Sequence, residues 1–355
     1  MLPEGAPDNG PAMHLIVPFA SPPAGGMPPG ASAEASTAWR APHPPRLQGL
    51  HLPRLATLVA RWRAGAADVD EPTSLTPPHE RALGRALGLQ AQDGCWPLAA
   101  VEAARLGLPG SDGAWAWLSP AHWRLGTEQV SMADPAALAL DEASSRAFLE
   151  TLRPVFEEQG ITLHPVSAQR WLACHGDFEG VPCASLDRVA GRNVDPWLPA
   201  DARARWLRRL QSEAQMLWHG HPLNETREAR GELAVNSVWW SGCGRAGRAV
   251  PWPEGLVVDE RLRAAALAAD TVAWCRALES LDAQALPALE AAVARGEPAA
   301  LTLCGERAAV TLRPAAAGGG LRPGPWLAMW LRAAGARLRG SAGANAGVAE
   351  FLENL

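Results

Sequence analysis

The chain of 355 residues contains no lysine and no tyrosine, so all 32 of its basic residues are arginines. The absence of lysine excludes enzymes that form a Schiff base on lysine, P-loop nucleotide-binding proteins and protein kinases, because each class depends on a lysine side chain. The 16 tryptophans, beside frequent alanine, arginine, glycine and proline, are typical of a GC-rich genome. We therefore attribute most of this bias to base composition.

Strong net charge and long apolar runs are also lacking. A net charge of -5 and an isoelectric point near 6.0 do not indicate binding of nucleic acid. The apolar run that follows Met13 covers only Leu15 to Ala20, whereas a membrane span needs about 20 residues. No basic segment precedes this run, so it is not a signal peptide. We expect a cytoplasmic protein without a nucleic-acid or membrane partner.

The six cysteines are scattered, and no two of them form a CxxC pair. This spacing favours reduced, mostly buried thiols over a disulfide framework or a zinc site. The motifs GxGxxG, HExxH and the EF-hand loop are absent as well. We therefore expect no metal and no other cofactor.

Hydrophobic periodicity predicts alternating strands and helices. The apolar run 14–19 predicts a central strand, and 52–62 predicts a helix with Pro53 in its first turn. A long helix at 141–159 precedes two strands at 161–166 and 170–173. Further helices are predicted at 78–87, 98–106, 201–218, 259–281, 283–295 and 325–334, and further strands at 114–118, 234–240, 300–303 and 308–312.

This order of elements predicts an α/β protein into which a smaller α+β lobe is inserted. We expect a disordered leader at 1–12, a core formed by 13–120 and 223–339, the inserted lobe at 121–222 and a loose tail at 340–355.

The stretch from Trp218 to Gly244 places polar side chains beside a predicted strand and a glycine-rich loop, where α/β proteins usually bind ligands. Arginine binds carboxylate and phosphate groups bidentately, and asparagine supplies a paired donor and acceptor. The sequence is equally consistent with a helix end capped by arginine and a buried turn held by asparagine. If these side chains bind a ligand, we expect an anion-binding pocket between lobe and core that consists of Arg188, Arg192, Asn224, Arg227 and Asn236.

Two further features resemble sites of chemistry. His219 and His221 form an H-x-H pair, but the pair lies in a turn before Pro222, so we favour helix capping over metal ligation. Cys243 stands between two glycines without a G-x-S-x-G motif, so we expect a small residue in a tight turn rather than a nucleophile.

The run HPLNETREARGELAVNSVWWSGCG at 221–244 resembles the segment by which archaeal-type, cofactor-independent phosphoglycerate mutases leave their substrate lobe and re-enter the core sheet. LPRLATLVARW at 52–62 is similar to their PNLDKLA helix, and VDPWLP at 194–199 to their DTDP turn. These enzymes belong to the alkaline-phosphatase-like superfamily, so the resemblance implies an alkaline-phosphatase-like core sheet flanked by helices. Over residues 13–315 the pattern is still more similar to bacterial RpfE-type regulatory proteins.

At the positions where these mutases carry their metal ligands and nucleophile, this chain has other residue types. The mutases carry an Asp-Gly metal-binding turn after their first strand, where this chain has Val17 to Ala20, and a nucleophilic serine where it has His51 to Pro53. The mutases also have histidine metal ligands in their C-terminal half, whereas no histidine follows His221 in this chain. A two-metal centre needs several Asp and His ligands. We therefore predict a non-catalytic, regulatory pseudoenzyme that binds a small phosphorylated or carboxylate ligand and has no catalytic residues.

Two alternatives stay open. The first is an active phosphoglycerate-mutase-like or phosphatase-like enzyme, which would be purified with manganese or zinc. The second is a structural partner in a protein complex, with exposed tryptophans as anchors. Four tryptophans, however, are expected in the core, because tryptophans within strands normally pack there: Trp115, Trp117, Trp239 and Trp240.

Overall fold

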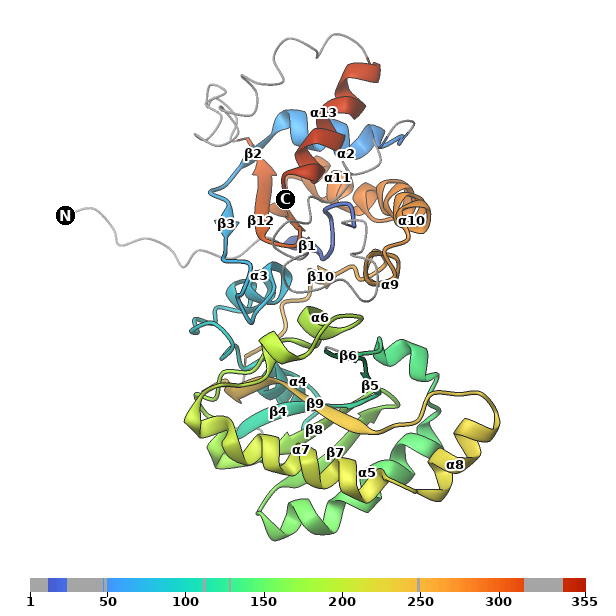
Figure 1. The fold of residues 1–355 in the computed structure, drawn as a ribbon. Coiled ribbons are helices and arrows are strands. Elements are labelled where there is room, and N and C mark those ends of the chain that lie inside the picture. The colour runs from blue at the N-terminus through green and yellow to red at the C-terminus, as the bar shows by residue number, and fades with distance from the viewer. Residues whose placement is uncertain are drawn as a thin grey trace, which may run out of the picture. The chain divides into compact units, whose positions relative to one another are not determined.

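The computed structural model describes residues 12–23, 47, 50–110, 113–127, 129–247, 250–315 and 341–355. The chain forms two compact units, of which unit 1 comprises Met1–Pro72 and Trp252–Leu355 and unit 2 comprises Thr73–Pro251 (Figure 1). Unit 2 is inserted between the two parts of unit 1, and its bounds are wider than the 121–222 expected for the lobe. Both units combine helices with a sheet, which confirms the α/β class.

Unit 1 is built on a mixed sheet with the strand order β10-β1-β11-β12-β2, and β3 also pairs with β12. Strand β1 (Met13–Val17) pairs in parallel with β10 (Leu256–Val258) on one side and β11 (Ala299–Cys304) on the other, so the predicted central strand is confirmed. Strand β11 turns back into antiparallel β12 (Ala308–Pro314), which confirms the strands predicted at 300–303 and 308–312. Two short strands complete this edge: β2 (Trp62–Ala64) and β3 (Asp68–Val69).

One hydrophobic core joins this sheet to the helices of unit 1. Helix α2 (Pro53–Arg61) begins with Pro53 in its first turn and buries Leu55, Leu58 and Val59, as the periodicity predicts. Trp62, expected on the same helix, is instead the first residue of β2. The other described helices of the unit are α9 (Arg263–Leu267), α10 (Thr271–Gln284), α11 (Leu286–Ala294) and α13 (Ser341–Glu353).

Two sequence expectations for unit 1 need correction. The helix predicted at 259–281 is broken between α9 and α10, where Ala269 takes a left-handed φ of 52° and Asp270 caps α10 by accepting a 2.9 Å hydrogen bond from the Ala273 N–H. The segment expected as a loose tail contains α13, because Phe351 and Leu352 reach the core and are fully buried there. The helix predicted at 325–334 and the leader at 1–11 lie outside the described residues.

A buried histidine lies within this sheet. The Nε2 atom of His14 is 2.7 Å from Thr302 Oγ1, which in turn is 2.9 Å from Thr311 Oγ1. Burial, with a smaller effect of the nearby Arg313 charge, lowers the pKa of His14 from 6.5 to about 4. His14 is therefore neutral at physiological pH.

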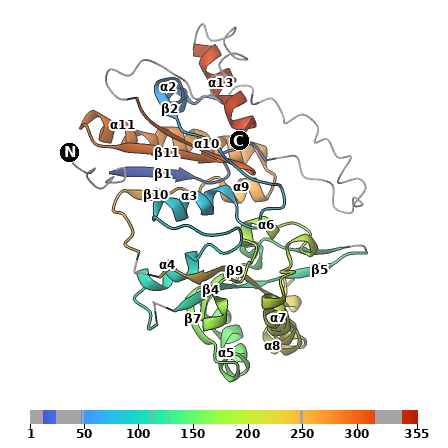
Figure 2. The ribbon, with the colours of Figure 1, turned by 90° about the vertical axis from the view of Figure 1, so that its left-hand side faces the viewer.

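Unit 2 is built on an antiparallel sheet in the order β7-β8-β4-β9. Helices α5 (Glu142–Glu158) and α7 (Arg205–Trp218) share a core with one face, and α4 (Leu98–Arg105) packs near Trp115 and Leu172 on the other (Figures 1 and 2). All four tryptophans expected in the core are at least partly buried. The strands are β4 (Ala114–Ala121), β7 (Thr162–Ser167), β8 (Arg170–Cys174) and β9 (Ser237–Arg245).

The glycine-rich loop expected after Trp240 is part of strand β9. This strand pairs with β4 through a register shift opposite Trp115 and Trp117. At the shift, Gly242 has a φ of 63°, and a Cβ on it would lie 2.6 Å from the Trp117 ring. Glycine is required here by the close approach and the backbone angle. Cys243 is consequently buried inside a bulged strand, and the expected tight turn is incorrect.

The remaining elements of unit 2 are short. A two-stranded ribbon is formed by β5 (Trp123–Leu125) and β6 (Val130–Met132), and helices α3 (Pro78–Ala86), α6 (Leu186–Val189) and α8 (Pro222–Ala229) complete the unit. Among the described residues, we find no helix with both the length and the hydrophobicity that a bilayer crossing requires.

Candidate functional site

Helix α8 begins directly after the turn that carries His219 and His221. Pro222 lies in its first turn, where a missing N–H costs nothing, and the Nδ1 atom of His221 accepts a 3.2 Å hydrogen bond from the Leu223 N–H. The favoured capping role is thus confirmed for His221. His219 is exposed just after α7.

Both the oxygen and the nitrogen of the Asn224 side-chain amide form hydrogen bonds with nearby backbone groups. Its Nδ2 donates to the carbonyl oxygens of Trp218 at 3.0 Å and Val235 at 2.8 Å, while its Oδ1 accepts from the Val235 N–H at 2.8 Å. The side chain is 5% exposed. Asn224 therefore joins the end of α7 to the segment that leads into β9, which matches the reading of a buried turn held by asparagine.

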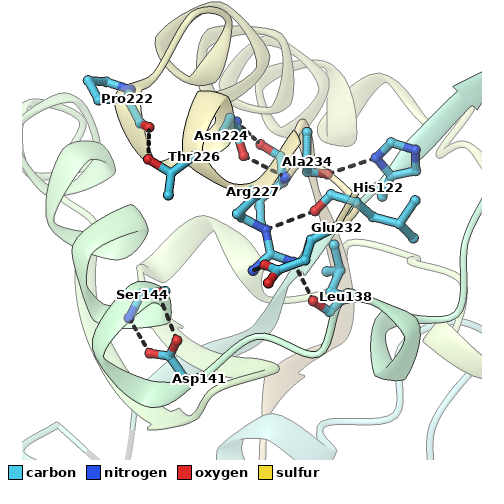
Figure 3. A network of polar contacts seen from close by, with 12 residues as sticks. His122, Leu138, Asp141, Ser144, Pro222, Asn224, Thr226, Arg227, Glu232 and Ala234 are labelled. Carbon is cyan, nitrogen blue, oxygen red and sulfur yellow. Dashed lines mark hydrogen bonds and ion pairs between the residues drawn. The ribbon is translucent and has the colours of Figure 1, made fainter. Parts of the chain in front are cut away.

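Arg227 has a similar role one helical turn further on (Figure 3). Its Nε donates to the Leu233 carbonyl at 2.8 Å, its Nη2 donates to the Leu138 carbonyl, and its Nη1 lies 3.2 Å from the Glu232 carboxylate. The residue is 5% exposed. The guanidinium thus ties three segments of unit 2 together, and its donors are directed at protein atoms.

Asn236 holds the start of the β5–β6 ribbon. Its Oδ1 accepts from the Trp123 N–H at 2.7 Å and its Nδ2 donates to the Trp123 carbonyl at 2.9 Å, so the amide pairs with Trp123 as a neighbouring strand would. Next to it, His122 Nδ1 is 2.7 Å from the carbonyl oxygen of Ala234 (Figure 3).

Arg188 lies in a different polar cluster, between α3 and α6. Its Nη2 is 3.5 Å from the Thr76 carbonyl oxygen, to which Arg81 Nη1 also donates at 2.7 Å. The Arg188 guanidinium carbon lies 5.9 Å from the centre of the Trp197 ring. Both arginines are at most 5% exposed.

The loop that carries Thr76 is fixed by Asp93. The Asp93 carboxylate accepts hydrogen bonds from Ser74 Oγ at 2.8 Å, Leu75 N–H at 2.8 Å and Thr76 N–H at 2.9 Å. Burial opposes ionisation of Asp93, but these hydrogen bonds outweigh it and lower the pKa of its carboxyl.

Four further residues of this cluster were not predicted from the sequence. His79 Nε2 lies 3.1 Å from the Asp187 carboxylate, and Ser185 Oγ donates to the Glu80 carboxyl at 2.5 Å. Burial raises the pKa of Glu80. The signal was present in the sequence, because the polar run His79-Glu80-Arg81 directly follows Pro77-Pro78, a strong helix start.

Arg192 is the exposed member of the predicted set. Its own N–H donates to the Val189 carbonyl at 2.9 Å, and its carbonyl accepts from the Met132 N–H at 3.0 Å. These bonds fix the backbone of the turn after α6 against β6, so that Arg192 is presented from an ordered segment.

The five predicted residues therefore fall into two groups. Asn224, Arg227 and Asn236 serve the backbone around α8 and the start of β9, whereas Arg188 and Arg192 lie at α6 and the turn that follows it. Both views show α6 and α8 at separate places in unit 2 (Figures 1 and 2).

In unit 1, the turn after β1 is apolar. Ala20 is fully buried and donates its N–H to the Cys304 carbonyl at 2.7 Å. Phe19 has a φ of 57°, and its carbonyl accepts a 2.8 Å hydrogen bond from the Trp274 indole. This turn occupies the position at which the family resemblance implies an Asp-Gly metal-binding turn.

A carboxyl group of the same unit accepts hydrogen bonds from the backbone N–H groups at the amino-terminal end of α2. Asp282, on α10, accepts hydrogen bonds from the Leu55 N–H at 2.7 Å and the Arg54 N–H at 3.3 Å, and it is 3% exposed. Burial raises the pKa of Asp282, although these hydrogen bonds act in the opposite direction. A helix amino terminus is a natural site for a phosphate, and here an internal carboxyl group fills it.

A search of the described residues found no group of three or more His, Cys, Asp or Glu side chains arranged to hold a metal ion.

Comparison of the sequence with curated proteins gave matches to one group of enzymes. The 2,3-bisphosphoglycerate-independent phosphoglycerate mutase of Methanosarcina mazei is 25% identical over 202 residues, which are 56% of this chain and 50% of the enzyme. The enzyme of that name from Methanosarcina barkeri is 22% identical over 210 residues, which are 59% of this chain and 52% of that enzyme. A probable enzyme of the same kind from Geobacter sulfurreducens is 23% identical over 215 residues. The chain thus spans about half the length of the curated relatives it matches.

Solved structures match this chain as well, among them the following two. The cofactor-independent phosphoglycerate mutase of Thermoplasma acidophilum aligns with a TM-score of 0.33 at 15% identity, over 85% of this chain and 89% of that chain. The PH0037 protein of Pyrococcus horikoshii aligns with a TM-score of 0.42 at 13% identity, over 89% and 90%. No family model matches the sequence. The sequence matches make this chain a distant relative of the cofactor-independent phosphoglycerate mutases of the alkaline-phosphatase-like superfamily.

Proposed function

We propose that the protein is a non-catalytic, cytoplasmic binding protein on a phosphoglycerate-mutase-like scaffold, with a regulatory role of the RpfE type. The observation that carries this proposal is the packing around β1 and α2. The turn after β1 is closed by Ala20 and Phe19, and the amino terminus of α2 is capped by Asp282. A phosphoryl group at that helix end would have to displace a buried carboxyl group, and like charges repel.

The proposed ligand is a small phosphorylated or carboxylate molecule bound at the turn after α6. Arg192 is the residue of the predicted set that is exposed to solvent, and it lies in this turn. Arg188 is buried and directed at the Thr76 carbonyl, so its role is to position the turn rather than to touch the ligand. Asn224, Arg227 and Asn236 are left out of this site, because the hydrogen bonds described above direct them at the backbone.

Titration calorimetry with 3-phosphoglycerate tests this site. We expect saturable binding that Arg192→Ala weakens at least about tenfold, because a charge-assisted contact to an anion contributes about 1.5 to 3 kcal/mol. The matched control is Arg208→Ala, which removes an exposed arginine of α7 in the same unit and is expected to leave the affinity unchanged. Equal weakening by both substitutions, or no binding by the unaltered chain, would contradict the proposal.

An active enzyme is the second candidate, and the curated relatives favour it, since all three carry the name phosphoglycerate mutase. It requires a reaction centre outside the turn after β1. Direct measurement of turnover separates the two candidates.

A further inference from the structure

Three cysteines from separate segments of unit 2 lie in one cluster. Cys95 lies between α3 and α4, Cys183 lies before α6, and Cys243 lies in β9. The Sγ atoms of Cys183 and Cys243 are 3.3 Å apart. Both side chains are buried, whereas Cys95 is only half-buried.

The backbone holds this cluster in place. The Cys183 N–H donates to the carbonyl of Gly94, the residue before Cys95, at 3.0 Å. Cys243 is fixed within β9, between Gly242 at the register shift and Gly244, which pairs with Trp115 of β4. A disulfide needs its sulfur atoms at about 2.05 Å, so the Cys183 and Cys243 sulfurs have to approach each other by about 1.2 Å.

We propose that Cys183 and Cys243 form a disulfide on reaction with a hydroperoxide, and that the half-buried Cys95 is the thiol at which the oxidant enters. Nothing in the family resemblance or in the proposed ligand site implies this modification. It gives the otherwise unused cluster a chemical role.

The reaction proceeds in three balanced steps. The Cys95 thiolate attacks the O–O bond of the hydroperoxide, takes one oxygen as a sulfenic acid and releases an alcohol, or water when the oxidant is hydrogen peroxide. Cys183 then attacks that sulfur as the thiolate, forms the Cys95–Cys183 disulfide and releases the oxygen as water. Cys243 displaces Cys95 from this disulfide. In total, two thiols lose two hydrogen atoms, and Cys95 is regenerated.

The rate should depend strongly on pH. Burial, together with the neighbouring Cys183, raises the pKa of the Cys95 thiol, and the hydrogen bond to Cys183 and burial raise that of Cys243. Because the thiolate is the attacking species, the reaction is expected to be slow at neutral pH. It should accelerate about tenfold per pH unit in the alkaline range below these pKa values.

The test treats the folded, full-length protein with hydrogen peroxide at mildly alkaline pH, blocks remaining thiols by alkylation and maps the cross-links by mass spectrometry. We expect two of the six thiols to disappear and a Cys183–Cys243 cross-link to form. Cys95→Ser is expected to slow its formation about tenfold, because direct oxidation of a buried thiol is slower. The control Cys275→Ser removes a half-buried cysteine of unit 1, whose pKa is also raised by burial, and should leave the rate unchanged.

Three results would overturn the proposal. The first is retention of all six thiols in the folded chain after treatment. The second is a cross-link that joins a different pair. The third is formation of the Cys183–Cys243 cross-link at the same rate in Cys95→Ser as in the unaltered chain, which would refute entry through Cys95.

Discussion

Replacement of Asn224 by alanine is expected to lower the free energy of unfolding by about 3 kcal/mol. The substitution removes three buried hydrogen bonds and leaves the carbonyls of Trp218 and Val235 and the Val235 N–H without the partner they have in the structure. A buried polar group that loses its partner costs about 1 to 3 kcal/mol, and water has little access here because Asn224 is 5% exposed. Urea unfolding followed by tryptophan fluorescence measures the change.

Asn193→Ala is the matched control for this prediction. Asn193 also accepts a hydrogen bond from a backbone N–H, that of Asp195 at 3.0 Å, but that contact is exposed and water can replace it. We expect a loss of about 0.5 to 1 kcal/mol. If Asn224→Ala instead kept the stability of the unaltered chain and abolished ligand binding, Asn224 would belong to an anion pocket, and its structural assignment would be refuted.

Stability should fall by about 3 kcal/mol as the pH drops from 6.5 to 4, through His14 alone. The pKa of His14 is lowered from 6.5 to about 4 in the folded chain by burial and by Arg313. Between these values, the unfolded chain binds a proton at His14 that the folded chain does not, so protonation favours unfolding. The contribution is fully present above pH 6.5 and is lost progressively toward pH 4.

Denaturant unfolding of His14→Gln across this pH range isolates the effect. The variant lacks the titrating group, so its stability should change less with pH than that of the unaltered chain by about the same 3 kcal/mol. The matched control is His51→Gln, which removes an exposed histidine of unit 1. Parallel pH profiles for the unaltered chain and His14→Gln would mean that His14 titrates normally in the folded state.

The strands and helices with a strong apolar period were predictable. Strand β1 is almost continuously apolar because successive side chains, which point to opposite faces of the sheet, are buried. Helix α2 buries one face through Leu55, Leu58 and Val59. In both elements the buried side chains recur with the period of the local structure, so the sequence alone shows which residues face the core.

Other features depended on contacts that a local pattern does not contain. Helix α13 is rich in glycine and alanine, and the packing of Val348, Phe351 and Leu352 into the core of unit 1 holds it in place. The course of β9 through Gly242 depends on the Trp117 ring, which lies far away in the sequence. Likewise, the composition of 222–229 resembles a turn, while the His221 cap and the Asn224 contacts make it a helix.

The candidate site also combines features that the sequence shows with features that depend on distant contacts. The residue types that bind anions were recognisable, but arginine and asparagine serve equally well to hold a backbone in place. Arg227 and Asn224 are directed at carbonyl oxygens, which is visible only once the segments around residues 138 and 235 are placed beside α8 (Figure 3). Arg192 retains an exposed position and therefore remains the proposed contact for a ligand.

The central claim is that this mutase-like scaffold binds a ligand without converting it. The most direct test is an assay of 3-phosphoglycerate conversion to 2-phosphoglycerate by the purified, full-length protein with added manganese. We expect no product above that of a protein-free blank, because the turn after β1 is apolar and Asp282 fills the amino terminus of α2. Product formation that rises in proportion to protein concentration would contradict it and establish a reaction centre elsewhere in the chain.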